Sequence, residues 1–149
     1  MANKTEGKND LRLVYTILCD DVRLEAGNKL SLMGVFQNIA VEQVPVSLIK
    51  LAVVSHWQGA GEFVSEVRIL TPDRKQFVVA SQPTAFGIEP GGFADNVSFF
   101  VNVVFREPGR YWVQTLVDST LFDEQPLVVT DARSAQQVSD ASADSEAVN

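Results

Sequence analysis

The chain has 149 residues, of which 46% are hydrophobic and 21% charged, the composition of one ordinary globular domain. A chain of this size buries roughly 68–70% of the surface that its unfolded form exposes, so it needs no disulfide or metal to fold. The formal net charge is −7, and the basic residues are scattered along the chain. Because phosphate binding needs clustered Lys and Arg, nucleic acid is not an expected partner.

The single histidine and the single cysteine limit the chemistry that one copy can perform. Zinc sites built from several Cys and His ligands are excluded, as is an intramolecular disulfide. Cys19 lies in an apolar run, which favours a small buried residue over a reactive thiol. His56 has no evident catalytic partner in the sequence. It alternates along its strand with residues predicted to face the core, so we expect His56 to face solvent. That core-facing set comprises Ile49, Leu51, Val53 and Trp57. We predict no catalytic residue, no cofactor and no enzyme activity.

Both ends of the chain differ from the middle in composition. Residues 1–10 are polar and lack an apolar targeting segment, and residues 131–149 are rich in Ala, Ser and Asp without an aromatic residue. We expect a mobile amino-terminal segment and a disordered acidic tail around one folded domain at residues 11–130. The apolar runs are far shorter than the ~20 residues needed to span a bilayer, so we expect a cytoplasmic protein without a membrane contact.

Hydrophobic residues within the domain alternate with a period of two, which is typical of strands. Turn residues such as Gly59, Gly61 and Pro90 separate the runs, and the segment at 20–27 could form at most one helical turn. Seven or eight strands with short turns predict an all-β, antiparallel, two-sheet β-sandwich, with a closed barrel as the alternative. The expected strands are residues 11–19, 29–37, 48–57, 62–71, 76–81 with a continuation at 84–89, 96–106, 110–119 and 125–130.

The segment Glu107-Pro108-Gly109-Arg110-Tyr111-Trp112-Val113 resembles the entry to strand F of immunoglobulin-like sandwiches. In such folds the tyrosine hydroxyl bonds to upstream backbone and fixes the crossover between two sheets. Tyr111 and Gly109 are therefore predicted structural residues of an immunoglobulin-like corner. A plain hairpin between residues 96–106 and 110–119, turning at Pro108-Gly109, is the alternative.

A wider resemblance begins at Leu18-Cys19-Asp20-Asp21-Val22-Arg23 with Glu25, and continues in Lys29-Leu30-Ser31-Leu32-Met33-Gly34-Val35-Phe36. These residues resemble the opening of a family of small bacterial proteins of unknown function. The similarity extends to Pro126-Leu127-Val128-Val129 and covers most of residues 14–130. This resemblance implies a compact bacterial β domain and supplies neither an activity nor catalytic residues.

Asp20, Asp21 and Glu25 form the densest acidic cluster and are weak candidates for a calcium site. Their spacing lacks the pattern of a dedicated calcium loop, and the alternative is that they cap a turn and pair with nearby basic residues. A ligand-binding domain, for carbohydrate or calcium, could use the loops near Asp20, Asp21 and Asp95.

Apolar residues predicted to point outward are the most informative feature of the sequence. If Val97, Phe99, Val101, Val103 and Phe105 line the core, alternation turns Phe100 and Val104 outward. If Tyr111, Val113, Thr115 and Val117 line the core, Trp112 and Leu116 also point outward. Phe93 lies at the tip of the predicted loop 89–96. Exposed apolar patches usually mark contact surfaces. A hairpin would merge four of these residues into one patch, whereas a corner would divide them between two sheets. Cover by another segment, or a shift of register, would instead bury them.

These observations predict a non-enzymatic protein-interaction or assembly module. Its expected partner is another protein or a second copy, bound through an outer sheet face or an edge strand.

Overall fold

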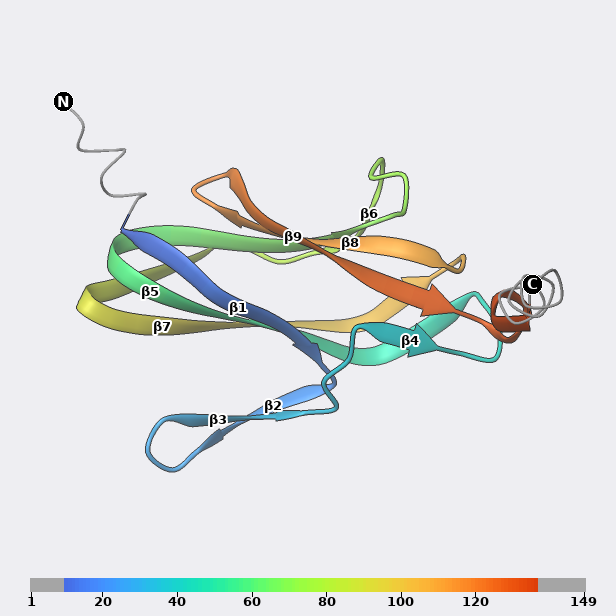
Figure 1. Ribbon diagram of the computed structural model, residues 1–149, viewed down its shortest axis with the longest axis horizontal. Helices are drawn as coiled ribbons and strands as arrows, with labels where there is room; N and C mark the ends of the chain where they lie inside the picture. The colour runs from blue at the N-terminus through green and yellow to red at the C-terminus, as the bar shows by residue number, and fades with distance from the viewer. Residues whose placement is uncertain (1–9, 137–149) are drawn as a thin grey trace, which may run out of the picture.

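The computed structural model describes residues 10–136, which form an all-β protein with nine strands (Figure 1). The strands are β1 (Leu11–Cys19), β2 (Asp21–Glu25), β3 (Lys29–Met33), β4 (Asn38–Ala40), β5 (Val46–Leu70), β6 (Phe77–Ala80), β7 (Thr84–Phe105), β8 (Gly109–Val117) and β9 (Thr120–Thr130).

Seven of the strands form one sheet in the order β1-β5-β8-β9-β4, with β6 and β7 both paired to β5. The remaining two, β2 and β3, form a separate antiparallel hairpin. The predicted all-β class is confirmed. The architecture needs correction, because the main sheet curls into a half-barrel instead of separating into two independent sheets (Figure 1). One cause is that the predicted turns at 58–61 and 90–92 are bends inside β5 and β7.

The long strand β5 changes neighbours at Gly59 and Gly61, where its register with β7 shifts. Residues 46–59 pair with residues 92–105 of β7, and residues 52–59 also pair with β1 on the other side. We call these three segments the open wing. Residues 61–70 pair with β8 on one side and with β6 and residues 84–88 of β7 on the other. These segments, with β9 and β4, are the closed wing.

The bend requires glycine at position 59. Gly59 has a φ of +144°, and a Cβ there would lie 1.6 Å from the carbonyl oxygen of Asp10. A larger residue at this position would collide with backbone, so glycine permits the close approach between the bend and the start of β1.

The main core lies between the inner faces of the two wings. It combines Leu51, Val53 and Phe100 of the open wing with Ile69 and Val113 of the closed wing. A second cluster surrounds the fully buried Trp57 near the bend. Ile49, predicted in the core, is instead 82% exposed.

The β2–β3 hairpin packs on the outer face of the open wing. Its residues Val22, Leu30 and Leu32 contact a buried cluster of Cys19, Ala52 and Val54. The one helical turn that the sequence allowed at 20–27 does not form, because residues 21–25 pair with residues 29–33. Positive φ angles at Gly27 and Asn28 form the tight turn between them.

The passage from β7 to β8 carries the chain from the open wing to the closed wing. Strands β7 and β8 both pair with β5 and not with each other, so the predicted hairpin alternative is wrong. The Tyr111 hydroxyl donates a hydrogen bond to the Glu107 carbonyl at 2.7 Å. This is the bond that the corner interpretation predicted.

The predicted mobile segment 1–10 and disordered tail 131–149 lie mostly outside the described residues. Within the described part, residues 132–136 are helical, and the Ser134 backbone N–H donates to the Asp131 carboxylate at 2.7 Å. The first residues of the predicted tail are therefore ordered. Between residues 10 and 136, no helix has the length and apolar character needed to cross a bilayer.

Candidate functional site

Two of the residues predicted to form an exposed surface are buried. Phe100 is 7% exposed and belongs to the main core, and Leu116 is 6% exposed. Their predicted exposure is wrong. For Phe100 the cause is Asn102, whose φ of +53° interrupts the alternation of β7. Val103 lies inside, but Val101 is turned outward and is 66% exposed.

Trp112 is half-buried on the closed wing. Its indole Nε1 donates to the Pro72 carbonyl at 3.3 Å, and the Arg74 guanidinium lies 3.8 Å from the ring centroid. Cation–π contacts of this kind stabilise an aromatic ring that would otherwise face water. The Trp112 ring is therefore covered by its own chain.

Val104 is 39% exposed and lines a surface pocket of about 470 Å³ with Phe77, Arg106 and Tyr111. Val104 and Trp112 lie on segments that do not pair with each other. The single patch that the hairpin alternative would have produced is absent from residues 10–136.

The open wing instead carries a row of rings on its outer face. Tyr15, His56 and Asp95 are cross-strand neighbours on β1, β5 and β7. His56 Nδ1 lies 2.5 Å from Asp95 Oδ1, and the Tyr15 and His56 rings stack at 5.1 Å. The centroid of the Phe93 ring lies 5.4 Å from the centroid of the His56 ring. Partial burial and the charge of Asp95 raise the pKa of Tyr15. His56 lies on the outer face as expected, but its side chain is only 20% exposed, and the structure gives it a carboxylate partner, Asp95, that the sequence did not reveal.

Four apolar residues of β7 continue this row and form the outer strip, defined as Phe93, Val97, Phe99 and Val101. Three of them are strongly exposed, Phe93 at 64%, Phe99 at 48% and Val101 at 66%. Val97 is half-buried because it packs beside the β2–β3 hairpin. Exposed apolar groups at this spacing form a contiguous surface along one strand.

Lys50 lies over this strip, 4.5 Å from the Phe99 ring centroid. The same ammonium group is 2.6 Å from Asp21 Oδ1 and lowers the pKa of that carboxyl group. Lys50 thus joins the strip to the β2–β3 hairpin.

The outer strip borders a free strand edge. Residues 93–105 pair with β5 on one side and, within residues 10–136, have no strand partner on the other. An unpaired strand edge presents backbone donors and acceptors that can pair with another strand. Natural edges are usually protected by Lys, Pro or a bulge, yet residues 91–105 contain no Lys, Arg or Pro. Their one charged residue, Asp95, is paired with His56.

The other edge of the open wing, β1, is protected differently. Its register shifts between Leu13 and Tyr15, and Phe36 donates a backbone hydrogen bond to Leu18 at 3.0 Å. A bulge and a covering segment both disfavour strand addition. The β7 edge is therefore the more accessible of the two.

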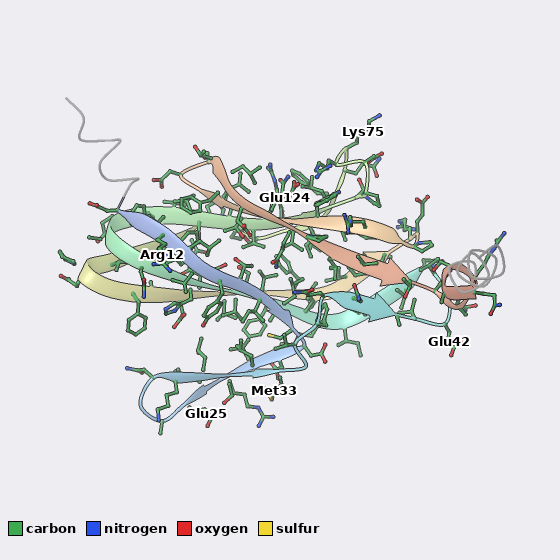
Figure 2. The ribbon with its side chains drawn as sticks, viewed as in Figure 1. Arg12, Glu25, Met33, Glu42, Lys75 and Glu124 are labelled. Carbon is green, nitrogen blue, oxygen red and sulfur yellow. The ribbon has the colours of Figure 1, made fainter. Side chains whose placement is uncertain are left out.

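The acidic candidates Asp20, Asp21 and Glu25 do not converge. Asp21 binds Lys50, Asp20 packs against Gly34, and Glu25 projects from the hairpin (Figure 2). Within residues 10–136, no group of three His, Cys, Asp or Glu side chains is arranged to hold a metal ion. The structure gives the predicted calcium alternative no set of ligands at these acids.

A model of a family of unknown function (DUF6941) matches residues 14–130. The chain belongs to this family. The predicted resemblance to a family of uncharacterised proteins is thereby confirmed over the range expected for it. No curated protein matches the chain.

Similar solved structures are much larger proteins. One is the alkylpurine DNA glycosylase AlkC of Pseudomonas fluorescens bound to abasic-site DNA, at 9% identity and a TM-score of 0.52. The match covers 81% of this family member and 30% of the glycosylase. It shows a shared fold alone. A β-glucosidase from Listeria innocua in complex with glucose matches at 11% identity, with a TM-score of 0.47 and coverage of 80% and 16%.

The predicted core positions of Phe99 and Val101 are wrong, because both are exposed, and the sequence prediction also missed Tyr15 as a surface residue. The absence of Lys, Arg and Pro from residues 91–105 is visible in the sequence and marks an unprotected edge. Phe93, the one predicted surface residue that is strongly exposed, lies within the outer strip.

Proposed function

We propose that this protein is a non-enzymatic interaction module that binds other protein surfaces through its open wing. The observation that carries the proposal is the free edge of β7 at residues 93–105, bordered by the exposed outer strip. A strand edge supplies directional backbone hydrogen bonds, and the adjacent apolar residues supply burial.

The polar groups on the same face are engaged by neighbours within the chain. The Asp95 carboxylate and the Asp21 carboxylate are each engaged by a basic side chain, His56 and Lys50. Tyr15 and Phe93 flank the His56 ring on both sides. Aromatic side chains are enriched at the centres of protein interfaces, which supports the proposal.

The architecture supports the same proposal. The inner faces of both wings form the core, so only the outer faces and free edges are available to a partner. On the closed wing, Arg74 covers Trp112, whereas Phe77 stays 60% exposed with the Arg68 guanidinium 5.3 Å from its ring centroid. On the open wing, Phe93 and Val101 remain more than half exposed.

Site-specific photo-crosslinking tests the proposal. A benzophenone amino acid in place of Phe99 should give discrete crosslinked products in cells that make the protein. The matched control places the same group at Phe77, which is 60% exposed on β6 of the closed wing. We expect products from position 99 that are absent from position 77.

A second variant tests whether those products depend on the free edge of β7. Val101→Glu places a charge in the outer strip at a residue that is 66% exposed, so the fold should be retained. The products from position 99 should then disappear. Identical products from positions 99 and 77, or products unaffected by Val101→Glu, would contradict the proposal.

A further inference from the structure

Resting on the proposed function, we infer that the partner of the β7 edge is a second copy of this chain. Two β7 strands would pair in antiparallel orientation about a twofold axis at Val97. The two open wings would then form one continuous six-stranded sheet.

The geometry of β7 selects this register. Residues 92–105 follow one uninterrupted register with β5, but Asn102, with a φ of +53°, ends the regular backbone of the edge. The stretch available for pairing is therefore 93–101, and Val97 is its midpoint. An axis at Val97 is the one that pairs this whole stretch with itself.

This register also matches apolar and charged groups. Phe93 of each copy would lie opposite Val101 of the other, so the two most exposed residues of the strip would cover each other. Asp95 would lie opposite Phe99 of the second copy, whose ring carries Lys50 at 4.5 Å. An axis at Asp95 would instead place two carboxylates face to face, which is unfavourable.

The composition of the β7 edge favours a second copy of the same strand as the partner over a charged peptide. The one charged residue between 91 and 105, Asp95, is hydrogen-bonded to His56, so the edge offers few charged groups to a basic or acidic strand. A copy of the same strand has the apolar spacing needed to match it.

Light scattering coupled to size-exclusion chromatography, on the full chain over a wide range of concentration, gives the first test. We expect the measured mass to rise from that of one chain to that of two chains as the concentration increases. Val101→Glu should weaken the association about tenfold or more, because the new charge would face Phe93 of the second copy. Leu24→Glu, at a 71% exposed apolar residue of the hairpin, is the matched control and should leave association unchanged.

Single introduced cysteines then test the register. The only native cysteine, Cys19, is buried and will not compete. Residues on a twofold axis face themselves, so Val97→Cys should form a disulfide-linked dimer under mild oxidation. Phe93→Cys and Val101→Cys should each remain mostly unlinked alone but should crosslink when mixed.

The outcomes separate this inference from the proposed function. A chain that stays monomeric at every concentration, or equal crosslinking at all three positions, would overturn self-pairing. If position 99 still crosslinks to a different protein, the interaction function survives and the partner is another chain. If neither experiment gives a product, both proposals fail.

Discussion

The open and closed wings belong to one sheet, yet they differ in the cover of one aromatic residue each, Trp112 on the closed wing and Phe93 on the open wing. On the closed wing, Arg68, Gln114 and Glu124 form a cross-strand row of hydrogen bonds, and Arg74 joins that row to the Trp112 ring. Figure 2 shows Glu124 on this wing. On the open wing, Phe93 and Val101 have no such cover within the described chain. The comparison shows that surface aromatic residues of one sheet can differ in cover, and under our proposal the uncovered face is the one that binds a partner.

The two wings depend on the bend at Gly59, and Gly59→Ala should have the largest effect on stability. The added Cβ would lie 1.6 Å from a backbone oxygen, at a φ of +144°. We expect a loss of about 3 kcal/mol or more in the free energy of unfolding, measured by chemical denaturation.

Gly91→Ala is the matched control for the bend. Gly91 lies opposite this region in β7 with a φ of +78°, and a Cβ there would have no neighbour within 4 Å. Only backbone strain of about 1–2 kcal/mol is expected. Equal losses for the two variants would show that the close approach at Gly59 is unimportant.

Substituting one aromatic residue on each wing tests the difference in cover directly. Trp112→Ser removes a ring that contacts Arg74 and the Pro72 carbonyl, and should cost about 1–2 kcal/mol. Phe93→Ser removes a ring that is 64% exposed and should change stability by about 0.5 kcal/mol or less. Thermal and chemical denaturation measure both, at a concentration low enough to keep the chain monomeric. A greater loss of stability for Phe93→Ser than for Trp112→Ser would contradict the difference in cover between the two wings.

The corner that connects the wings should depend on one hydroxyl group. Tyr111→Phe removes the donor to the Glu107 carbonyl at 2.7 Å and should cost about 1 kcal/mol. Tyr15→Phe is the control on the open wing, where the Tyr15 side chain is partly exposed. Chemical denaturation that gives the same midpoint for wild type and Tyr111→Phe would contradict a stabilising role for the corner.

The smallest expected effect concerns the polar row of the closed wing. Arg74 and Gln114 donate hydrogen bonds to Glu124 and lower its pKa from the ordinary value of 4.5. A carboxylate with a lowered folded-state pKa contributes stability above its unfolded pKa, and that stability is lost as the pH falls through the folded value. Glu124→Gln should cost roughly 0.5 kcal/mol at neutral pH, because Arg74 is partly exposed.

Melting temperatures measured against pH check this prediction. Wild type should lose more stability than Glu124→Gln as the pH falls below 4.5. Glu25→Gln, on the exposed hairpin, should follow the wild-type profile. Parallel profiles for wild type and Glu124→Gln would contradict the proposed contribution of the row.

The sequence predicted much of the fold because alternation is a local signal. The period of two identified the strands around Leu11, Leu51 and Tyr111, and the corner motif predicted the Tyr111 hydrogen bond. The turn signals at Gly59 and Gly91 were misread as strand ends, since the same residues also permit a bend within a continuous strand.

The proposed binding face was harder to predict, because one backbone residue changes which side chains of β7 point outward. Asn102 adopts a left-handed conformation, which reverses the sides expected for Phe99, Phe100 and Val101. Trp112 was predicted exposed, but its cover depends on Arg74, which is close only in the folded chain. Long-range cover of this kind has no local sequence signal.

Amide hydrogen exchange of the full chain, compared at low and high protein concentration, tests the central claim that the β7 edge is a pairing surface. The account predicts added protection at residues 93–101 at high concentration, with no change in β4 and β9. Exchange at residues 93–101 that is independent of concentration, or protection that instead appears in the closed wing, would contradict it.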